Sequence, residues 1–422
     1  MIPNDLITPQ IQRVRDSFSS EDAAGRKYPI REIFRRFYPL YLQTHPTPSF
    51  QVQRVANAIM RCKTGELGYN VSFCDDCGYS LTHTVSCNNR YCPCCQSALI
   101  KKWELERTSE LITGISYYHV VFTLPEEINH LMLANQKLLF DLFFRCVKDT
   151  LIELCADPKF MGAKPSVFGV LHTWGQKLNF HPHIHLCVSG GGITPANTFV
   201  ETRHKGFFIP EKVLASSLRG RFITELKQFY DAGKLDFSYT PNLGKAEHWK
   251  SFVNTLFSKA WLPFVKETFN GNGNAVKYLA RYSFRSAIAN SRIVSFDDSE
   301  VTFSYKDYTD NCKQKQMTVK GTEFIRLFLQ HVLPRHFNRM RSFGLLTNCR
   351  KKKNLHLVHK LRNTVYRGNP YQSMNNSQLL KVLYKKDICS CEKCGGRMRF
   401  FPRGQPEYML PLLPKRTYLA TS

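Results

Sequence analysis

Three histidines stand at alternate positions in the segment from Asn179 to Ser189, and they constrain the fold more than any other feature of the chain. Alternate side chains of a β-strand point to the same face, so a strand from His183 to Val188 would present His183 and His185 together. The apolar side chains between them would fix this strand in a core. Neutral imidazole is a common ligand of divalent metals. The pattern therefore predicts a strand that carries a metal site, and the alternative is a histidine-rich strand edge without a metal.

The segments around the histidine strand predict further elements of one sheet. Residues 117–125 are a β-branched and aromatic run that ends at a proline, and residues 166–178 alternate between two faces, so both predict strands. The second of these leads through a short turn into the histidine strand, which predicts an antiparallel hairpin. Residues 128–155 carry apolar side chains at helical spacing. His172 or Gln176 could supply a third metal ligand from the neighbouring strand, and either could equally be a structural residue.

Helical spacing and turn residues predict several other elements. Residues 30–42 and 49–62 predict two helices, with Ser49 as the N-cap of the second. Residues 248–268 predict a helical stretch that is interrupted by a proline. The glycine triplet at residues 190–192 predicts a flexible loop that ends the histidine strand.

The composition favours a globular protein that binds a polyanion. Of the 422 residues 43% are hydrophobic and 13% aromatic, which suffices for packed cores, and the length suggests two or three domains. The formal net charge is +26, and a protein this basic usually binds nucleic acid, although a basic surface can also serve solubility alone. The sequence shows neither an apolar run of about 18 residues nor an N-terminal signal segment. It therefore predicts a cytoplasmic, DNA-associated protein with no membrane partner.

The cysteines predict a zinc site, because 15 cysteines in a chain expected to be cytoplasmic favour metal binding over disulfides. Cys74 and Cys77 flank two residues and precede a glycine that permits a tight turn, and Cys92 and Cys95 repeat the spacing further on. The spacing predicts one structural Zn²⁺ site made by these four thiolates, in a module that faces DNA or serves only as a structural staple. The same stretch also holds spare ligands, which are Cys62, His83, Cys87 and Cys94.

The C-terminal part of the chain carries half of a second zinc motif. Cys391 and Cys394 are separated by two residues and followed by glycines, with Cys389 just before them, and no further Cys-x-x-Cys follows. This pair could bind a metal together with a distant thiolate such as Cys349, or bind none. Residues 335–362 are rich in Arg and Lys, which predicts a phosphate-contacting surface or merely a solvated helix face.

A second candidate site lies in residues 275–289, whose alanine and leucine content favours a helix. Tyr278 and Tyr282 are four residues apart and would therefore share a face of that helix. A basic band at the same spacing accompanies them, and its members are Lys277, Arg281 and Arg285. Nearby positive charge helps a phenol to lose its proton, so the tyrosines are candidate nucleophiles beside phosphates. The alternative is a pair of structural aromatic residues.

The histidine strand and the tyrosine helix together indicate one reaction. A metal can polarise a phosphodiester while a tyrosine attacks the phosphorus. A DNA 3′-hydroxyl then leaves and the enzyme keeps the 5′-phosphate as an ester. Because the ester conserves the energy of the bond, the strand can later be rejoined without ATP.

Several motifs, in order over residues 61–303, resemble those of a known family. They are Arg61–Gly68, Cys74-x-x-Cys77-Gly78, Ser86–Gln96, Phe122-Thr123-Leu124-Pro125, His181-Pro182-His183-Ile184-His185 and Tyr278-Leu279-Ala280-Arg281-Tyr282. On these motifs the chain resembles the two-tyrosine HUH transposases of rolling-circle bacterial insertion sequences, relatives of the eukaryotic Helitrons. One departure is Cys94, which stands where a basic or polar residue is more usual and leaves open which thiolates bind zinc.

The resemblance implies an α+β fold, in which an HUH nuclease domain with a central antiparallel sheet flanked by helices follows a small helical and zinc-binding domain. It implies that His183 and His185 hold Mg²⁺ or Mn²⁺ and that Tyr278 and Tyr282 are the nucleophiles. The enzyme would be a metal-dependent single-strand DNA endonuclease and strand transferase that forms 5′-phosphotyrosine. Its partners would be single-stranded element ends and target DNA, held by a basic groove and aromatic stacking.

We expect three domains in this chain. Residues 1–112 would form the helical and zinc-binding domain, residues 113–320 the catalytic domain, and residues 321–422 a basic C-terminal region with a possible second zinc knuckle. The sequence does not indicate the oligomeric state, the recognised DNA ends or which tyrosine acts first.

Three alternative functions stay open at this point. A rolling-circle replication initiator would use the same chemistry, but the cysteine pattern and the paired tyrosines favour the transposase. A non-catalytic, zinc-dependent DNA-binding regulator would tolerate phenylalanine at both Tyr278 and Tyr282. A metal hydrolase of small molecules would leave the net charge of +26 unexplained.

Overall fold

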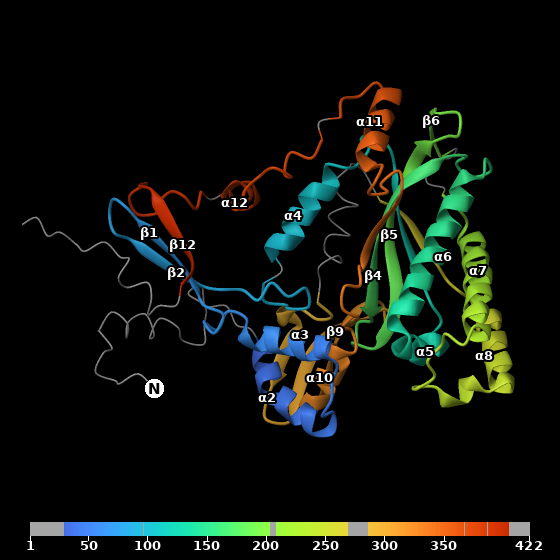
Figure 1. Ribbon diagram of the computed structural model, residues 1–422, viewed down its shortest axis with the longest axis horizontal. Coiled ribbons are helices and arrows are strands. Elements are labelled where there is room, and N and C mark those ends of the chain that lie inside the picture. The colour runs from blue at the N-terminus through green and yellow to red at the C-terminus, as the bar shows by residue number, and fades with distance from the viewer. Residues whose placement is uncertain are drawn as a thin grey trace, which may run out of the picture.

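An antiparallel sheet with the histidine strand at its centre organises the larger part of the molecule (Figure 1). The computed structural model describes residues 29–95, 97–202, 208–268, 286–366, 368–385 and 387–404. Within these residues the sheet has six strands, in the order β11-β4-β5-β3-β7, with β6 paired to β5. The strands are β3 (Tyr117–Thr123), β4 (Lys164–Trp174), β5 (Phe180–Ile193), β6 (Phe199–Glu201), β7 (Phe264–Thr268) and β11 (Met340–Gly344).

The hairpin of β4 and β5 forms as expected, and its register places His172 opposite His183. The strand does not end at the glycine triplet, because β5 continues to Ile193. A Cβ atom at Gly192 would lie 2.2 Å from the backbone oxygen of Lys164. The predicted loop was therefore wrong, since glycine here permits a close approach of the two strands.

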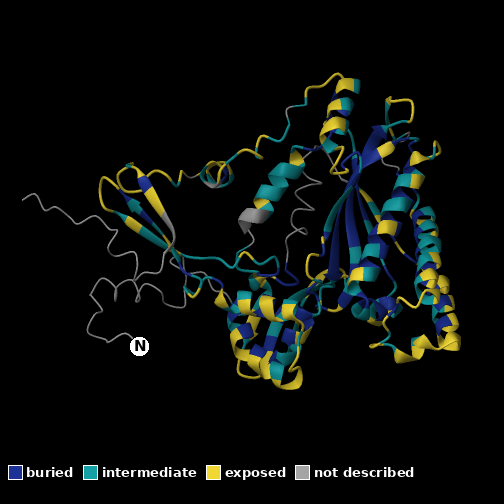
Figure 2. Cartoon of the chain, in the orientation of Figure 1, coloured by how far each residue is buried: buried dark blue, intermediate teal, exposed yellow. Residues whose placement is uncertain are grey.

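Helices cover one face of this sheet, and their inner sides are buried (Figures 1 and 2). They are η2 (Glu126–Ile128), α5 (Asn129–Ala134), α6 (Gln136–Ala156), α7 (Glu211–Asp231), η3 (Pro241–Gly244) and α8 (Ala246–Ser258). Along α6, Leu139, Phe143 and Val147 recur every four residues and are fully buried, so this stripe faces the core. The helix predicted over residues 248–268 is wrong in its second half, where α8 ends and the edge strand β7 begins.

A second antiparallel sheet packs against the first helices of the described chain. Its strands lie in the order β10-β9-β8, and the group consists of α2 (Pro29–Thr44), α3 (Phe50–Arg61), η4 (Asn290–Arg292), β8 (Ile293–Phe296), β9 (Glu300–Asp307), β10 (Lys313–Lys320) and α10 (Gly321–Leu329). The Ser49 hydroxyl accepts a hydrogen bond from the amide of Val52 at 3.3 Å, which confirms the predicted N-cap. The rings of Phe34 and Phe328 meet edge to face at 5.0 Å and join α2 to α10.

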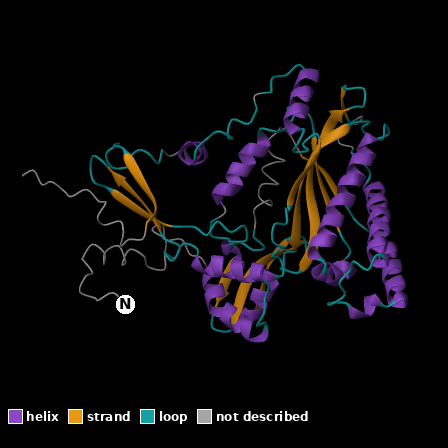
Figure 3. Ribbon diagram, viewed as in Figure 1, coloured by secondary structure: helices purple, strands orange, loops and turns teal. Residues whose placement is uncertain are grey.

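A third, small sheet combines segments from the two ends of the described chain. β1 (Tyr69–Cys74) lies between β2 (Ser80–Thr84) and β12 (Met398–Gly404), and all three pair antiparallel. Figure 3 shows this sheet apart from the two larger groups. The remaining helices are α4 (Ser97–Thr108), α11 (Lys351–Leu361) and α12 (Asn376–Tyr384).

The antiparallel sheets flanked by helices, preceded by a cysteine-rich module, confirm the expected α+β fold class. The central sheet extends past the boundary expected at residue 320, because β11 pairs with β4. The small sheet likewise joins the first and last expected domains through the pairing of β1 with β12. In the described part of the chain, no helix is long and apolar enough to span a membrane.

Candidate active site

The centre of the candidate site is a group of three histidines on one face of the central sheet. Strand β4 contributes His172, and β5 contributes His183 and His185. One ring nitrogen from each lies within 4.8 Å of the others. His172 and His185 are 2% and 8% exposed, while His183 is partly buried. The structure therefore brings the two predicted ligands together with His172, which is the candidate third ligand.

Hydrogen bonds orient the rings of this group. Nδ1 of His183 lies 2.7 Å from the carbonyl oxygen of His181, and because a carbonyl only accepts, Nδ1 carries the proton. The lone pair of neutral His183 is then on Nε2. Nδ1 of His185 lies 3.0 Å from Nε2 of His119, so one of these two nitrogens donates to the other. If His185 is the donor, its Nε2 also keeps a lone pair for a metal.

Burial lowers the pKa of three imidazoles at this site, those of His183, His119 and His185. It lowers the pKa of His183 to about 4, against the opposing effect of the bond to His181. Burial and the positive charge of Lys266 lower the pKa of His119 to about 4 as well. The pKa of His185 lies well below its ordinary value, first through burial and then through the neighbouring imidazoles. Neutral imidazole is the form that binds metals, so the site is ready for a cation at neutral pH.

Trp174 packs against the histidine group, and the hydrogen bonds of Gln176 argue against Gln176 as the third ligand. The ring of Trp174 stacks on His172 with centroids 4.6 Å apart. Gln176, the other candidate for a third ligand, is engaged elsewhere: its carbonyl accepts from the amide of Lys306 at 3.4 Å, and its amide donates to the hydroxyl of Tyr308 at 3.5 Å. Of the described residues, only histidines belong to the group.

The donor set fits a divalent transition ion better than Mg²⁺. Three imidazole nitrogens leave further coordination positions for oxygens of a substrate or of water. Mg²⁺ prefers oxygen ligands and usually binds through carboxylates and retained waters, whereas imidazole suits softer ions. Of the two ions expected from the sequence, Mn²⁺ therefore fits this group better.

The predicted nucleophiles and the basic band lie outside the described residues. This applies to Tyr278, Tyr282, Lys277, Arg281 and Arg285. The chain leaves the described part after β7, the strand beside β3, and returns at Ser286. Ala287 and Ile288 follow and are buried in the main core. The roles of the two tyrosines and of the basic band therefore stay predictions.

The cysteines predicted to form one zinc site belong to two separate groups. Cys92 and Cys95 lie with Cys62 and Cys87, whereas Cys74 and Cys77 lie with two cysteines near the C-terminal end of the described chain, Cys391 and Cys394. The prediction of a single site made by Cys74, Cys77, Cys92 and Cys95 is therefore wrong in its grouping. All four residues are candidate metal ligands, but in different places.

The geometry of the β1–β2 hairpin explains this division. Cys74 ends β1 and Cys77 lies in the turn, so this pair is at the tip of the hairpin. At the base, the amide of Lys63 donates to the carbonyl of Val85 at 3.3 Å, which brings Cys62 close to the segment that follows β2. The amide of Cys87 there donates to the sulfur of Cys62 at 3.5 Å. A pattern of two-residue spacings does not reveal that the hairpin holds the two pairs apart.

The cysteine group at the base of the hairpin is held against distant segments of the chain. The sulfurs of Cys87 and Cys95 are 3.7 Å apart. The hydroxyl of Tyr91 accepts from the amide of Leu333 at 2.8 Å. The Asn290 side chain donates to the carbonyl of Pro93 at 3.4 Å, and thereby ties the chain just after Ile288 to this module. The module thus supports the segment that leads away from the predicted tyrosine helix.

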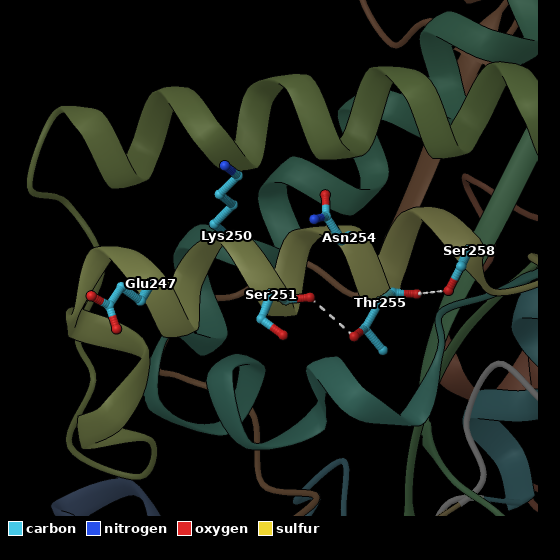
Figure 4. A pocket seen from close by; sticks show the side chains of 6 residues that line it. All are labelled: Glu247, Lys250, Ser251, Asn254, Thr255 and Ser258. Carbon is cyan, nitrogen blue, oxygen red and sulfur yellow. Dashed lines mark hydrogen bonds between the residues drawn. The ribbon is translucent and has the colours of Figure 1, made fainter.

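A surface hollow of about 580 Å³ along α8 is a different feature (Figure 4). Only residues of that helix line it, and Figure 4 shows Lys250 and Asn254 on the side that faces a neighbouring helix. None of the grouped histidines or cysteines lines this hollow. It is not the candidate active site.

Comparisons with known proteins agree with these features. A family model described as "Putative transposase" matches residues 166–353, and one described as "Transposase zinc-binding domain" matches residues 33–124. The chain is 40% identical over 327 residues to "Putative transposase y4qJ" of Sinorhizobium fredii, which covers 77% of this chain and 82% of that protein. It is 27% identical over 351 residues to "Transposase for insertion sequence element IS801" of Pseudomonas savastanoi pv. phaseolicola, with 81% of each covered. No solved structure matches the chain significantly.

The histidine-bearing sheet and these matches define the protein as a DNA transposase with a zinc-binding N-terminal module. More particularly, the chain belongs to the family of two-tyrosine HUH transposases of bacterial insertion sequences. The resemblance drawn from the ordered motifs is therefore confirmed.

Sequence reasoning missed His119 as part of the site, although it stands in the predicted strand over residues 117–125.

Proposed function

We propose that this transposase cleaves and rejoins single-stranded DNA through 5′-phosphotyrosine intermediates, in rolling-circle-type transposition in the bacterial cytoplasm. The observation that carries the proposal is the group of His172, His183 and His185, oriented by hydrogen bonds to His119 and His181. Buried imidazoles kept neutral and aimed at one point are suited to a cation. The net charge of +26 supports a nucleic-acid substrate.

The three histidines are assigned to a divalent ion, which would supply Lewis-acid polarisation of the scissile phosphodiester. Tyr278 or Tyr282 would attack the phosphorus with its phenol oxygen. The bond from phosphorus to the DNA 3′-oxygen breaks, and the 5′-phosphate stays on the tyrosine. A second tyrosine lets the protein hold another strand end while the first ester is transferred to target DNA.

The basic band on the tyrosine segment is assigned to the DNA backbone. Lys277, Arg281 and Arg285 follow the same spacing as the tyrosines, so their charges would lie beside the reacting phosphate. Such contacts position the strand and make its binding dependent on salt. Aromatic stacking would hold the unpaired bases, which favours single-stranded ends over duplex DNA.

The cysteine group at the base of the hairpin is assigned one structural Zn²⁺. Four thiolates at Zn–S distances of about 2.3 Å lie roughly 3.8 Å apart in a tetrahedron, and the sulfurs of Cys87 and Cys95 are 3.7 Å apart. Cys62 and Cys92 complete the group. Cys94 is the neighbouring thiol outside it, and its sulfur accepts from the Asn290 side chain at 3.8 Å.

A covalent-adduct assay tests the proposal. Labelled single-stranded DNA carrying an element end is incubated with the full-length protein and Mn²⁺, then denatured and separated by size. We expect a protein-linked DNA band that needs the metal and is lost in the double variant Tyr278→Phe and Tyr282→Phe. Tyr308→Phe is the matched control, because Tyr308 is 66% exposed in the turn that follows β9.

Two further results decide between the proposal and its alternatives. His183→Ala should abolish the band while the protein remains folded, because His183 is only partly buried. A band that persists in the double tyrosine variant would contradict the assigned nucleophiles. Complete absence of a band, with the correct DNA end and folded wild-type protein, would favour a non-catalytic DNA-binding regulator.

A further inference from the structure

We propose that Cys74, Cys77, Cys391 and Cys394 form a second structural Zn²⁺ site, a zinc ribbon that the two ends of the described chain build together. The sulfurs of Cys74 and Cys394 are 3.5 Å apart, and those of Cys77 and Cys391 are 3.7 Å apart. All four sulfurs lie within 4.8 Å of one another. Tetrahedral Zn²⁺ bound by four thiolates requires separations of roughly 3.8 Å. The matched zinc-binding domain ends at residue 124, so it does not contain the C-terminal pair.

Each half of this site is a Cys-x-x-Cys-Gly turn with the same backbone geometry. Gly78 and Gly395 both adopt positive φ angles, +69° and +77°. The amide of Gly78 donates to the carbonyl of Cys74 at 3.2 Å, and the amide of Gly395 donates to the carbonyl of Cys391 at 2.9 Å. This turn directs the two thiols of a pair to one side, and glycine permits it without strain.

Backbone amides stabilise negative charge on the C-terminal thiols. The amide of Lys393 donates to the sulfur of Cys391 at 3.4 Å, and the amide of Gly396 donates to the sulfur of Cys394 at 3.4 Å. Metal-bound cysteine is a thiolate, and donors placed around it favour that form. The same two-residue offset recurs in the other cysteine group, in the bonds from Asn89 to Cys87 and from Cys94 to Cys92.

The pairing of β1 with β12 aligns the two halves across more than 300 residues of sequence. Cys74 stands opposite Met398 in the register. Just beyond it, the amide of Asp75 donates to the carbonyl of Arg397 at 3.0 Å. The Arg399 guanidinium and the Asp75 carboxylate form an ion pair at 2.8 Å. These contacts hold the C-terminal turn beside the tip of the hairpin.

The small sheet has too little core to be stable without a metal. Its buried cluster consists of Cys74, Cys391 and Met398, with Tyr79 and Leu81 packed against it. Two of the three buried side chains are therefore ligands. Modules with so few buried apolar groups usually need a metal or a disulfide, and Zn²⁺ can supply the missing folding free energy. The consequence is that zinc binding would fasten the C-terminal strand β12 to the N-terminal module.

Zinc content of the full-length protein tests this proposal. After exhaustive dialysis, inductively coupled plasma mass spectrometry should find two Zn²⁺ per wild-type chain and one in Cys394→Ser. Cys389→Ser is the matched control, because Cys389 is exposed and adjacent but outside the group, and it should keep two. Cys394→His offers an imidazole ligand in place of the thiolate and should also keep two.

Hydrogen exchange distinguishes loss of this site from general unfolding. In Cys394→Ser, amide protection should fall in β1, β2 and β12 while α6 in the catalytic core stays protected. The expected total of two rests in part on the Zn²⁺ assigned under the proposed function to the group of Cys62, Cys87, Cys92 and Cys95. The difference between wild type and variant is therefore decisive, and equal zinc contents in the wild type and Cys394→Ser would overturn the proposal. The test uses no DNA cleavage, so its outcome does not depend on the tyrosine chemistry.

Discussion

Replacing His119 by alanine should weaken metal binding, although His119 is not one of the three grouped ligands. Its Nε2 atom lies 3.0 Å from Nδ1 of His185, and the residue is 5% exposed. Residues that orient a ligand typically contribute about 10- to 100-fold to metal affinity. We therefore expect His119→Ala to weaken Mn²⁺ binding within that range.

Isothermal titration calorimetry with Mn²⁺ on the full-length protein measures this effect. His119→Gln keeps a side chain that can donate or accept toward His185, so it should recover part of the loss. His172→Ala removes a ligand and should cost more than His119→Ala. His130→Ala alters an exposed histidine outside the group and serves as the control. Equal Mn²⁺ affinity in wild type and His119→Ala would refute the reasoning.

Two other predictions concern folding. Gly321→Ala should lower the free energy of unfolding by about 1–3 kcal/mol, because its Cβ atom would lie 2.2 Å from the ring of Phe37. The Cβ atom of Gly220→Ala within α7 meets nothing within 4 Å. This change should therefore raise the free energy of unfolding by about 0.5–1 kcal/mol. Urea unfolding compares the two variants, and equal effects on stability would contradict the packing argument. The second prediction is that stability falls as the pH drops from about 6.5 toward 3, because burial lowers the pKa of His331 to about 3 and only the unfolded chain binds this proton in that window. The unfolding midpoint, measured as a function of pH, should vary less in His331→Gln than in the wild type. An unchanged variation would contradict the assignment of this pH dependence to His331.

The elements around the histidines could be predicted because their signals are local. In β5 histidines alternate with apolar residues, a pattern that neighbouring residues show, and the short turn between β4 and β5 predicts the hairpin. The pairing of His172 with His183 did not follow from that hairpin, because β4 ends at Trp174 and not at residue 178, which shifts the register. Ser49 likewise predicts the start of α3, because an N-cap side chain bonds a backbone amide within the next three residues.

The parts of the site that depend on distant pairing could not be predicted in this way. His119 reaches His185 only because β3 lies beside β5 in the sheet, and that order is a property of the whole fold. Sequence proximity groups Cys74 with Cys92 and Cys95, whereas the pairing of β1 with β12 brings Cys74 beside Cys394. From the sequence alone, the glycine triplet predicts a flexible loop. Glycine in a strand indicates close packing only when the neighbouring strand is known.

The most direct test of the account is to locate the metal. Crystals of the full-length protein grown with Mn²⁺ would be measured near the manganese absorption edge, where an anomalous difference map marks the ion. The account predicts one peak within bonding distance of a ring nitrogen from each of His172, His183 and His185. A fully occupied Mn²⁺ site elsewhere in the protein, with no peak among these three rings, would contradict it.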